Sequence, residues 1–170
     1  MMSALPAHPS DSIPGQDETH GRIHTLLSVV TAAILEQQPR LATFEDHRPP
    51  RDRSSGDSWH GLQTLCHVSA LLTSSGLPED SPHGTTALLD AADAIAASHG
   101  MRRRSEQQGS GSTGRTWISA TGDLLEVIVG VRVAVRAISA PFLPGSLTPM
   151  ASTSPASALS PLTPPPRLVR

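Results

Sequence analysis

The sequence predicts an all-α protein, a small and loosely packed bundle of three to four short helices with disordered N- and C-terminal segments. Three observations support this prediction. Apolar residues recur at helical spacing in several segments, proline, serine and glycine crowd into the stretches between them, and aromatic residues make up 2% of the chain. Aromatic rings supply large buried areas. A core without them has to form from aliphatic helix faces that meet closely.

The first helix is expected over residues 19–38. Its apolar positions fall at i, i+3, i+4, i+7 and i+11, which is one face of an α-helix. Thr19 can cap the start, and Gln38 precedes a proline, which disfavours further helix. The apolar face consists of Ile23, Leu26, Leu27, Val30 and Ile34. We expect this face to meet a partner chain or a second copy, because large residues that could fill an internal core are few.

A second helix is expected over residues 58–75. Ser58 is a good N-cap residue, Gly76 stands where a glycine often ends a helix, and Pro78 follows. Apolar residues between these signals lie near one face of the expected helix.

A third helix, over residues 82–99, has the clearest local pattern. Ser81 can cap it, and Pro82 occupies the first helical position, where its missing N–H costs nothing. The segment is rich in alanine, which favours helix and lets a neighbour approach closely. Gly100 then ends it.

The fourth segment, residues 117–139, fits two structures. Valines at positions 127, 129, 131, 133 and 135 alternate strictly, which is typical of a strand. Leu124, Ile128, Val131, Val135 and Ile138 also form a helical stripe. A lone strand needs partners, and no other segment has a strand pattern. The prediction is therefore a helix, with a strand over 124–138 as the open alternative.

The remaining segments are rich in proline, glycine and polar residues. Residues 1–18 are expected to be disordered, as is the Pro/Ser-rich tail 141–170. Flexible linkers are expected at 39–57 and 101–116 within the helical region 19–140.

Composition narrows the function classes. The formal net charge of −2 argues against strong electrostatic attraction to nucleic acid or an anionic membrane. The single cysteine, Cys66, excludes an internal disulfide framework. No apolar stretch reaches the roughly eighteen residues of a membrane span, and the start of the chain lacks signal-peptide features. A cytoplasmic protein without a cofactor is expected.

Histidine supplies the one candidate metal pattern. His20 and His24 stand four residues apart, so on a helix they share a face and could hold one ion. Further ligands would have to come from elsewhere, with His60 and His67 as candidates. The expectation is a set of solvated surface histidines with no bound metal, and a metal site at His20 and His24 is the alternative.

Three other groups of residues could have a functional role, but each also fits a purely structural one. Cys66 is expected to be a small buried hydrophobe rather than a reactive thiol. Asp90 and Asp93 could bind a cation or a basic partner, but we expect them to lie on a solvated helix face. Arg102, Arg103 and Arg104 could contact phosphate. We expect them instead to favour the end of a helix and to aid solubility.

The sequence therefore predicts a non-catalytic helical interaction or regulatory protein that binds another chain or itself. Three alternatives remain open. One is a small DNA-binding regulator that uses Arg102–Arg104, another is a metal-dependent enzyme that uses His20 and His24, and the last is a reading frame with no selected function.

Overall fold

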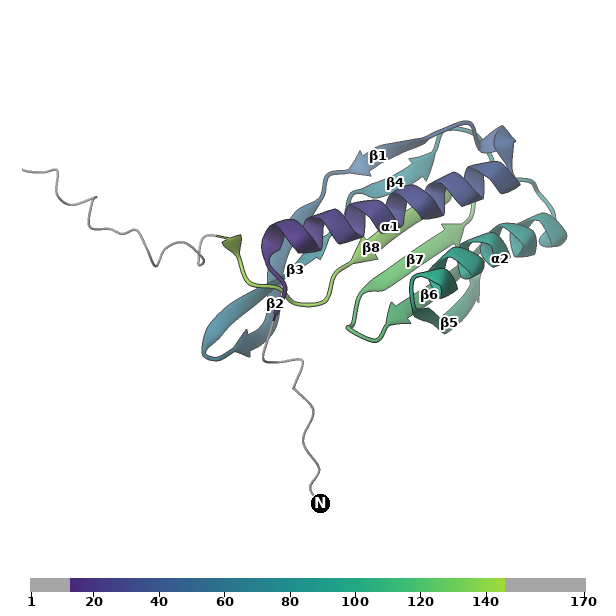
Figure 1. Cartoon of the computed structure of the whole chain (residues 1–170). Coiled ribbons are helices and arrows are strands. Elements are labelled where there is room, and N and C mark those ends of the chain that lie inside the picture. The colour runs from purple at the N-terminus through teal and green to yellow at the C-terminus, as the bar shows by residue number, and fades with distance from the viewer. Residues whose placement is uncertain (1–12, 146–170) are drawn as a thin grey trace, which may run out of the picture.

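The computed structural model describes residues 13–145, and in it two helices lie side by side on one face of an eight-stranded antiparallel sheet (Figure 1). The predicted all-α bundle is therefore wrong. The helices are α1 (Gln16–Gln37) and α2 (Pro82–Ser98), and a 3-10 turn, η2 (Pro39–Leu41), follows α1. The strands are β1 (Phe44–Arg48), β2 (Arg51–Trp59), β3 (Leu62–Val68), β4 (Leu71–Ser74), β5 (Met101–Gly109), β6 (Ser112–Ser119), β7 (Leu124–Val129) and β8 (Val133–Ile138).

Two of the predicted helices are confirmed. The helix expected at 19–38 is α1, and the helix expected at 82–99 is α2. The Ser81 side chain caps α2 by accepting a hydrogen bond from the Gly84 N–H at 2.9 Å. Thr19 does not cap α1, because Gly15 is the N-cap and the Thr19 hydroxyl donates to the Gly15 carbonyl.

The predicted helix at 58–75 is wrong, because this segment contains the end of β2 and the strands β3 and β4. His60 and Gly61 join β2 to β3 with φ values of 51° and 80°. Two consecutive positive φ angles are typical of the tight turn that connects hairpin strands. A helix could not pass through this left-handed pair.

The predicted helix at 117–139 is also wrong, since β7 and β8 form an antiparallel hairpin there. The alternation of valines was the correct signal. Four of them are buried against the helices, at positions 127, 129, 133 and 135. Val131 lies on the turn between the strands and is 82% exposed.

The expected linkers 39–57 and 101–116 contain strands as well. Residues 101–109 form β5, and β2 begins at Arg51. Most side chains of both strands are exposed on both faces. Backbone pairing with a neighbouring strand, not an apolar face, holds them in the sheet. This explains why no pattern of apolar residues marked them.

The expected disordered ends lie mostly outside the described residues, at 1–12 and 146–170. Where the structure does describe these ends, it shows order. Helix α1 begins at Gln16, and Phe142 is fully buried and bridges to Leu65 of β3.

The sheet bends where two neighbouring strands are interrupted at the same level. Its main path is β1-β4-β8-β7-β6-β5, while β2 pairs with β3. Pro49-Pro50 separates β1 from β2, and Ser69-Ala70 separates β3 from β4. Beyond this double break the β2–β3 hairpin projects past the start of α1 (Figure 1).

The core lies between the helices and one face of the sheet. The apolar stripe of α1 packs there with the buried valines of β7 and β8. Ala92 and Ala96 of α2 are fully buried, so their small side chains let α2 approach its neighbours. Across residues 13–145, neither helix combines the length and apolar character that crossing a lipid bilayer requires.

Gly76 and Gly21 give a matched test of this packing. A Cβ at Gly76 would overlap the backbone oxygen of Arg40, whereas a Cβ at Gly21 on α1 would meet nothing within 4 Å. We expect Gly76→Ala to lower the free energy of unfolding by about 1–3 kcal/mol through overpacking. Gly21→Ala should raise it by roughly 0.5–1 kcal/mol, because alanine favours helix. Urea unfolding followed by circular dichroism measures both, and equal effects would contradict the close approach at Gly76.

Candidate functional site

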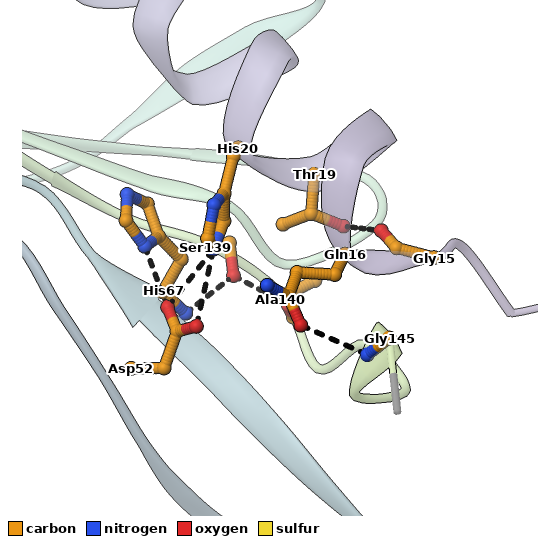
Figure 2. A network of polar contacts seen from close by, with 9 residues as sticks. All are labelled: Gly15, Gln16, Thr19, His20, Asp52, His67, Ser139, Ala140 and Gly145. Atoms are coloured by element: carbon orange, nitrogen blue, oxygen red, sulfur yellow. Dashed lines mark hydrogen bonds and ion pairs between the residues drawn. The ribbon is translucent and has the colours of Figure 1, made fainter. Parts of the chain in front are cut away.

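Three side chains from three elements converge where the β2–β3 hairpin meets the start of α1 (Figure 2). His20 comes from α1, Asp52 from β2 and His67 from β3. His20 Nε2 lies 3.0 Å from Asp52 Oδ1 and 3.2 Å from Oδ2, and His67 Nδ1 lies 2.7 Å from Oδ1. Both imidazoles therefore approach the same carboxylate oxygen.

Strand pairing sets the position of two of these side chains. Asp52 and His67 are directly opposite each other in the β2–β3 register, so both point to the same face of the hairpin. The backbone of His67 is fixed from the other side by Ser139. Its N–H donates to the Ser139 hydroxyl at 2.9 Å, and its carbonyl accepts from the Ser139 N–H at 2.8 Å.

The start of α1 brings His20 to the hairpin. Gln16 accepts a hydrogen bond from the Gly145 N–H at 2.8 Å through its side chain, which ties the helix to the segment after β8 (Figure 2). The ring of His20 lies 4.0 Å from that of His67 and stands edge-on to buried Phe142 at 5.7 Å. These ring contacts hold the two imidazoles against the hairpin.

The cluster is partly open to solvent. The side-chain exposure is 35% for His20, 23% for Asp52 and 12% for His67. An ion could therefore reach the cluster without unfolding of the hairpin, while His67 is largely shielded from water.

The candidate ligand atoms lie close enough together to be drawn onto one small divalent ion. One nitrogen from each histidine and one carboxylate oxygen all lie within 4.8 Å of one another. An ion about 2.0–2.2 Å from each ligand would separate neighbouring ligands by roughly 3.0–3.5 Å. The contacts of Asp52 Oδ1 at 2.7 and 3.0 Å would have to lengthen by a few tenths of an ångström, and the proton in each of these hydrogen bonds would have to leave. Two imidazoles and one carboxylate suit zinc, iron(II), cobalt and nickel, and leave a coordination position open.

The sequence offered part of this cluster as candidate ligands, although the expectation was solvated histidines with no bound metal. His20 was a candidate, and His67 was named as a further ligand, but the structure does not bring His24 or His60 to the site. His24 is exposed on α1, and His60 lies at the tip of the β2–β3 hairpin. Asp52 was missed, because only the pairing of β2 with β3 places it beside His67.

The other sequence candidates take structural roles. Asp90 accepts a hydrogen bond from Arg115 at 2.9 Å, and Asp93 accepts one from the Trp117 indole at 2.7 Å. Burial of the Arg115 guanidinium disfavours its charge, but hydrogen bonds to Asp90 and Glu106 outweigh this, and the pKa of Arg115 is raised. The two aspartates thus fasten α2 to the sheet.

The arginine triplet lies on β5 rather than beyond a helix end. Arg103 lies 3.6 Å from Asp93 and 3.4 Å from Glu106, whereas Arg102 and Arg104 are exposed. The residues expected to bind a partner, Ile23, Leu26, Leu27, Val30 and Ile34, are all buried in the core of this chain. That face of α1 therefore packs on the chain's own sheet.

Comparison with known proteins shows the fold alone. No protein-family model and no curated protein matches the sequence. A solved structure, that of a DUF4853 family protein from Actinomyces odontolyticus, resembles this chain with a TM-score of 0.50 and 13% sequence identity. The likeness covers 75% of this chain and 69% of that one.

Cys66 gives a test of local burial beside the site. It precedes His67 on β3 and therefore points to the opposite face of the strand. Burial raises the pKa of the Cys66 thiol, with nearby Arg53 opposing the rise. A raised pKa adds stability that is present below the ordinary thiol value and is lost as the pH rises through the folded-state pKa.

We expect Cys66 to react slowly with a disulfide reagent at pH 8, because the folded protein disfavours the thiolate. Unfolding in urea should speed the reaction, and Cys66→Ser should abolish it. Equal rates for the folded and unfolded protein would contradict a partly buried, protonated thiol.

Proposed function

We propose that this chain binds a divalent transition metal ion through His20, Asp52 and His67. The observation that carries the proposal is the convergence of one Asp52 oxygen and two imidazole nitrogens from α1, β2 and β3. Zinc is the ion that best suits this ligand set, because it accepts nitrogen and oxygen donors and tolerates three protein ligands plus water. The proposed role is binding, and no reaction is assigned to it.

The surroundings of the cluster support a binding role. Two of the three ligands stand on paired strands and the third on a helix, so their backbones are already ordered before an ion arrives. Ordered ligands lose less conformational entropy on binding than ligands on loops. Asp52 also supplies a negative charge that offsets part of the ion's charge.

The expected role in protein interaction remains a proposal, but the surface that would bind a partner is a different one. The α1 stripe is buried, so a partner would have to bind a different surface. The DNA-binding alternative stays a prediction, with Arg102 and Arg104 exposed and Arg103 in contact with Asp93 and Glu106.

Metal titration of tag-free protein tests the main proposal. We expect zinc to bind with one ion per chain in isothermal titration calorimetry. His20→Ala, Asp52→Asn and His67→Ala should each weaken binding by at least about tenfold, since even the loss of groups that orient a ligand costs that much. His24→Ala is the matched control, because His24 lies one turn along α1 and outside the cluster. It should bind zinc like the unaltered chain.

Two results would contradict the proposal. The first is that zinc does not bind at micromolar concentrations. The second is that zinc binds equally well to the His20→Ala, Asp52→Asn and His24→Ala variants, which would place the ion elsewhere. Magnesium serves as a control ion, because it prefers oxygen ligands and should not compete with zinc.

Metal affinity should also fall as the solution becomes acidic. Histidine binds a metal only through a nitrogen that carries no proton, so protons compete with the ion. Zinc titrations at pH 7.5 and pH 5.5 measure this loss. An affinity that does not change with pH would contradict binding through the two imidazoles.

A further inference from the structure

The face of the sheet opposite the helices carries three ordered rows of side chains. The middle row contains Thr116, Glu126 and Arg136, which lie side by side on β6, β7 and β8. One flanking row contains Ile118, Leu124 and Ile138, and the other contains Gly114, Ile128 and Ala134. All nine residues are partly exposed, whereas their sequence neighbours on β7 and β8 point into the core.

No described element packs on this face. Both helices lie on the other side of the sheet (Figure 1), where the core cluster is found. An apolar sheet face is usually covered by a second layer. Within residues 13–145, the isoleucine and leucine side chains of the flanking rows have no such layer.

Arg136 is a charged residue of the middle row that already has a partner within the chain. Its terminal nitrogen donates to Glu126 Oε1 at 2.7 Å, but its buried Nε has no hydrogen-bond partner among the described residues. A buried donor of a charged group normally has an acceptor. The terminal nitrogens of this half-exposed side chain, rather than the covered Nε, are the atoms that a second carboxylate could reach.

The three rows are complementary to themselves. A two-fold axis parallel to the strands, between β7 and β8, would place Glu126 of one copy opposite Arg136 of the other. The same axis would place Leu124 opposite Ile138 and Ile128 opposite Ala134. Apolar rows would thus meet apolar rows, and each charge would meet its opposite.

The position of this axis makes the overlap large. In the path β1-β4-β8-β7-β6-β5, the gap between β8 and β7 is the middle of the sheet. Six strands about 4.8 Å apart and about 20 Å long give a twisted face of roughly 600 Å² per copy. This approaches the ~800 Å² per partner that standard interfaces bury.

We infer that two copies of this chain associate through the helix-free faces of their sheets, with Glu126 of each copy paired with Arg136 of the other. The two sheets form a sandwich of the aligned type, in which strand directions differ by about 30°. The core of the interface consists of the isoleucine and leucine side chains of the flanking rows.

Light scattering on the full chain tests this inference first. The mass expected at tens of micromolar is twice the 17.8 kDa of one chain. Ile128→Lys should shift the mass to that of one chain, because it places a charge in an apolar row. Val131→Lys is the matched control, since Val131 is 82% exposed on the β7–β8 turn and lies outside the three rows.

Charge reversal separates the interface from the pair within one chain. Glu126→Arg and Arg136→Glu each put like charges opposite each other, and each should raise the dissociation constant of the dimer roughly a hundredfold. Mixing the two variants should restore association, because the arginines of one then face the glutamates of the other. If the Glu126–Arg136 pair acts only within one chain, mixing the two variants should not restore association.

Circular dichroism on every variant checks that it folds. A mass of 17.8 kDa for the unaltered chain at tens of micromolar would overturn the inference. A dimer that Ile128→Lys leaves intact would also overturn it, by placing the contact on another surface. If a charge-reversal variant does not fold, the comparison of Ile128→Lys with Val131→Lys decides.

Discussion

The structure depends on the contact between two helices and one face of the sheet. The apolar stripe of α1 and the small residues of α2 cover the valines of β7 and β8, and this layer contains most of the buried apolar side chains. With only two described helices, one face of the sheet is covered. The other face keeps its isoleucine and leucine side chains partly exposed, so the same contact that stabilises the fold also leaves a surface for association.

The candidate metal site depends on a second constraint, the break in two neighbouring strands. Pro49-Pro50 and Ser69-Ala70 interrupt the strands at the same level, since Arg48 pairs with Leu71 and Arg51 with Val68. The hairpin beyond the break meets the start of α1. His20 thereby reaches Asp52, which is 32 residues away in the chain. The cluster and the open sheet face lie on different parts of the molecule, and neither proposal requires the other.

Local signals were sufficient for the two helices and insufficient for the strands. Ser81, Pro82 and Gly100 marked the ends of α2, because capping depends on residues adjacent in the chain. Strands β2 and β5 gave no signal, since their polar side chains are exposed and their stability comes from a paired backbone. The alternating valines do indicate strands, but the pairing strands β6 and β4 carry no such alternation, so the sequence favours a helix there.

The sequence by itself determined where two helices form and which face of α1 is apolar. It offered His20, His24, His60 and His67 as possible ligands but could not separate the pair that meets from the pair that does not. The tertiary structure alone decided that the α1 stripe packs inside the chain, that Asp52 joins the histidines and that Glu126 lies beside Arg136. The reason is physical. Helix formation and capping act over about four residues, whereas strand pairing joins residues at any separation and leaves little trace in either strand alone.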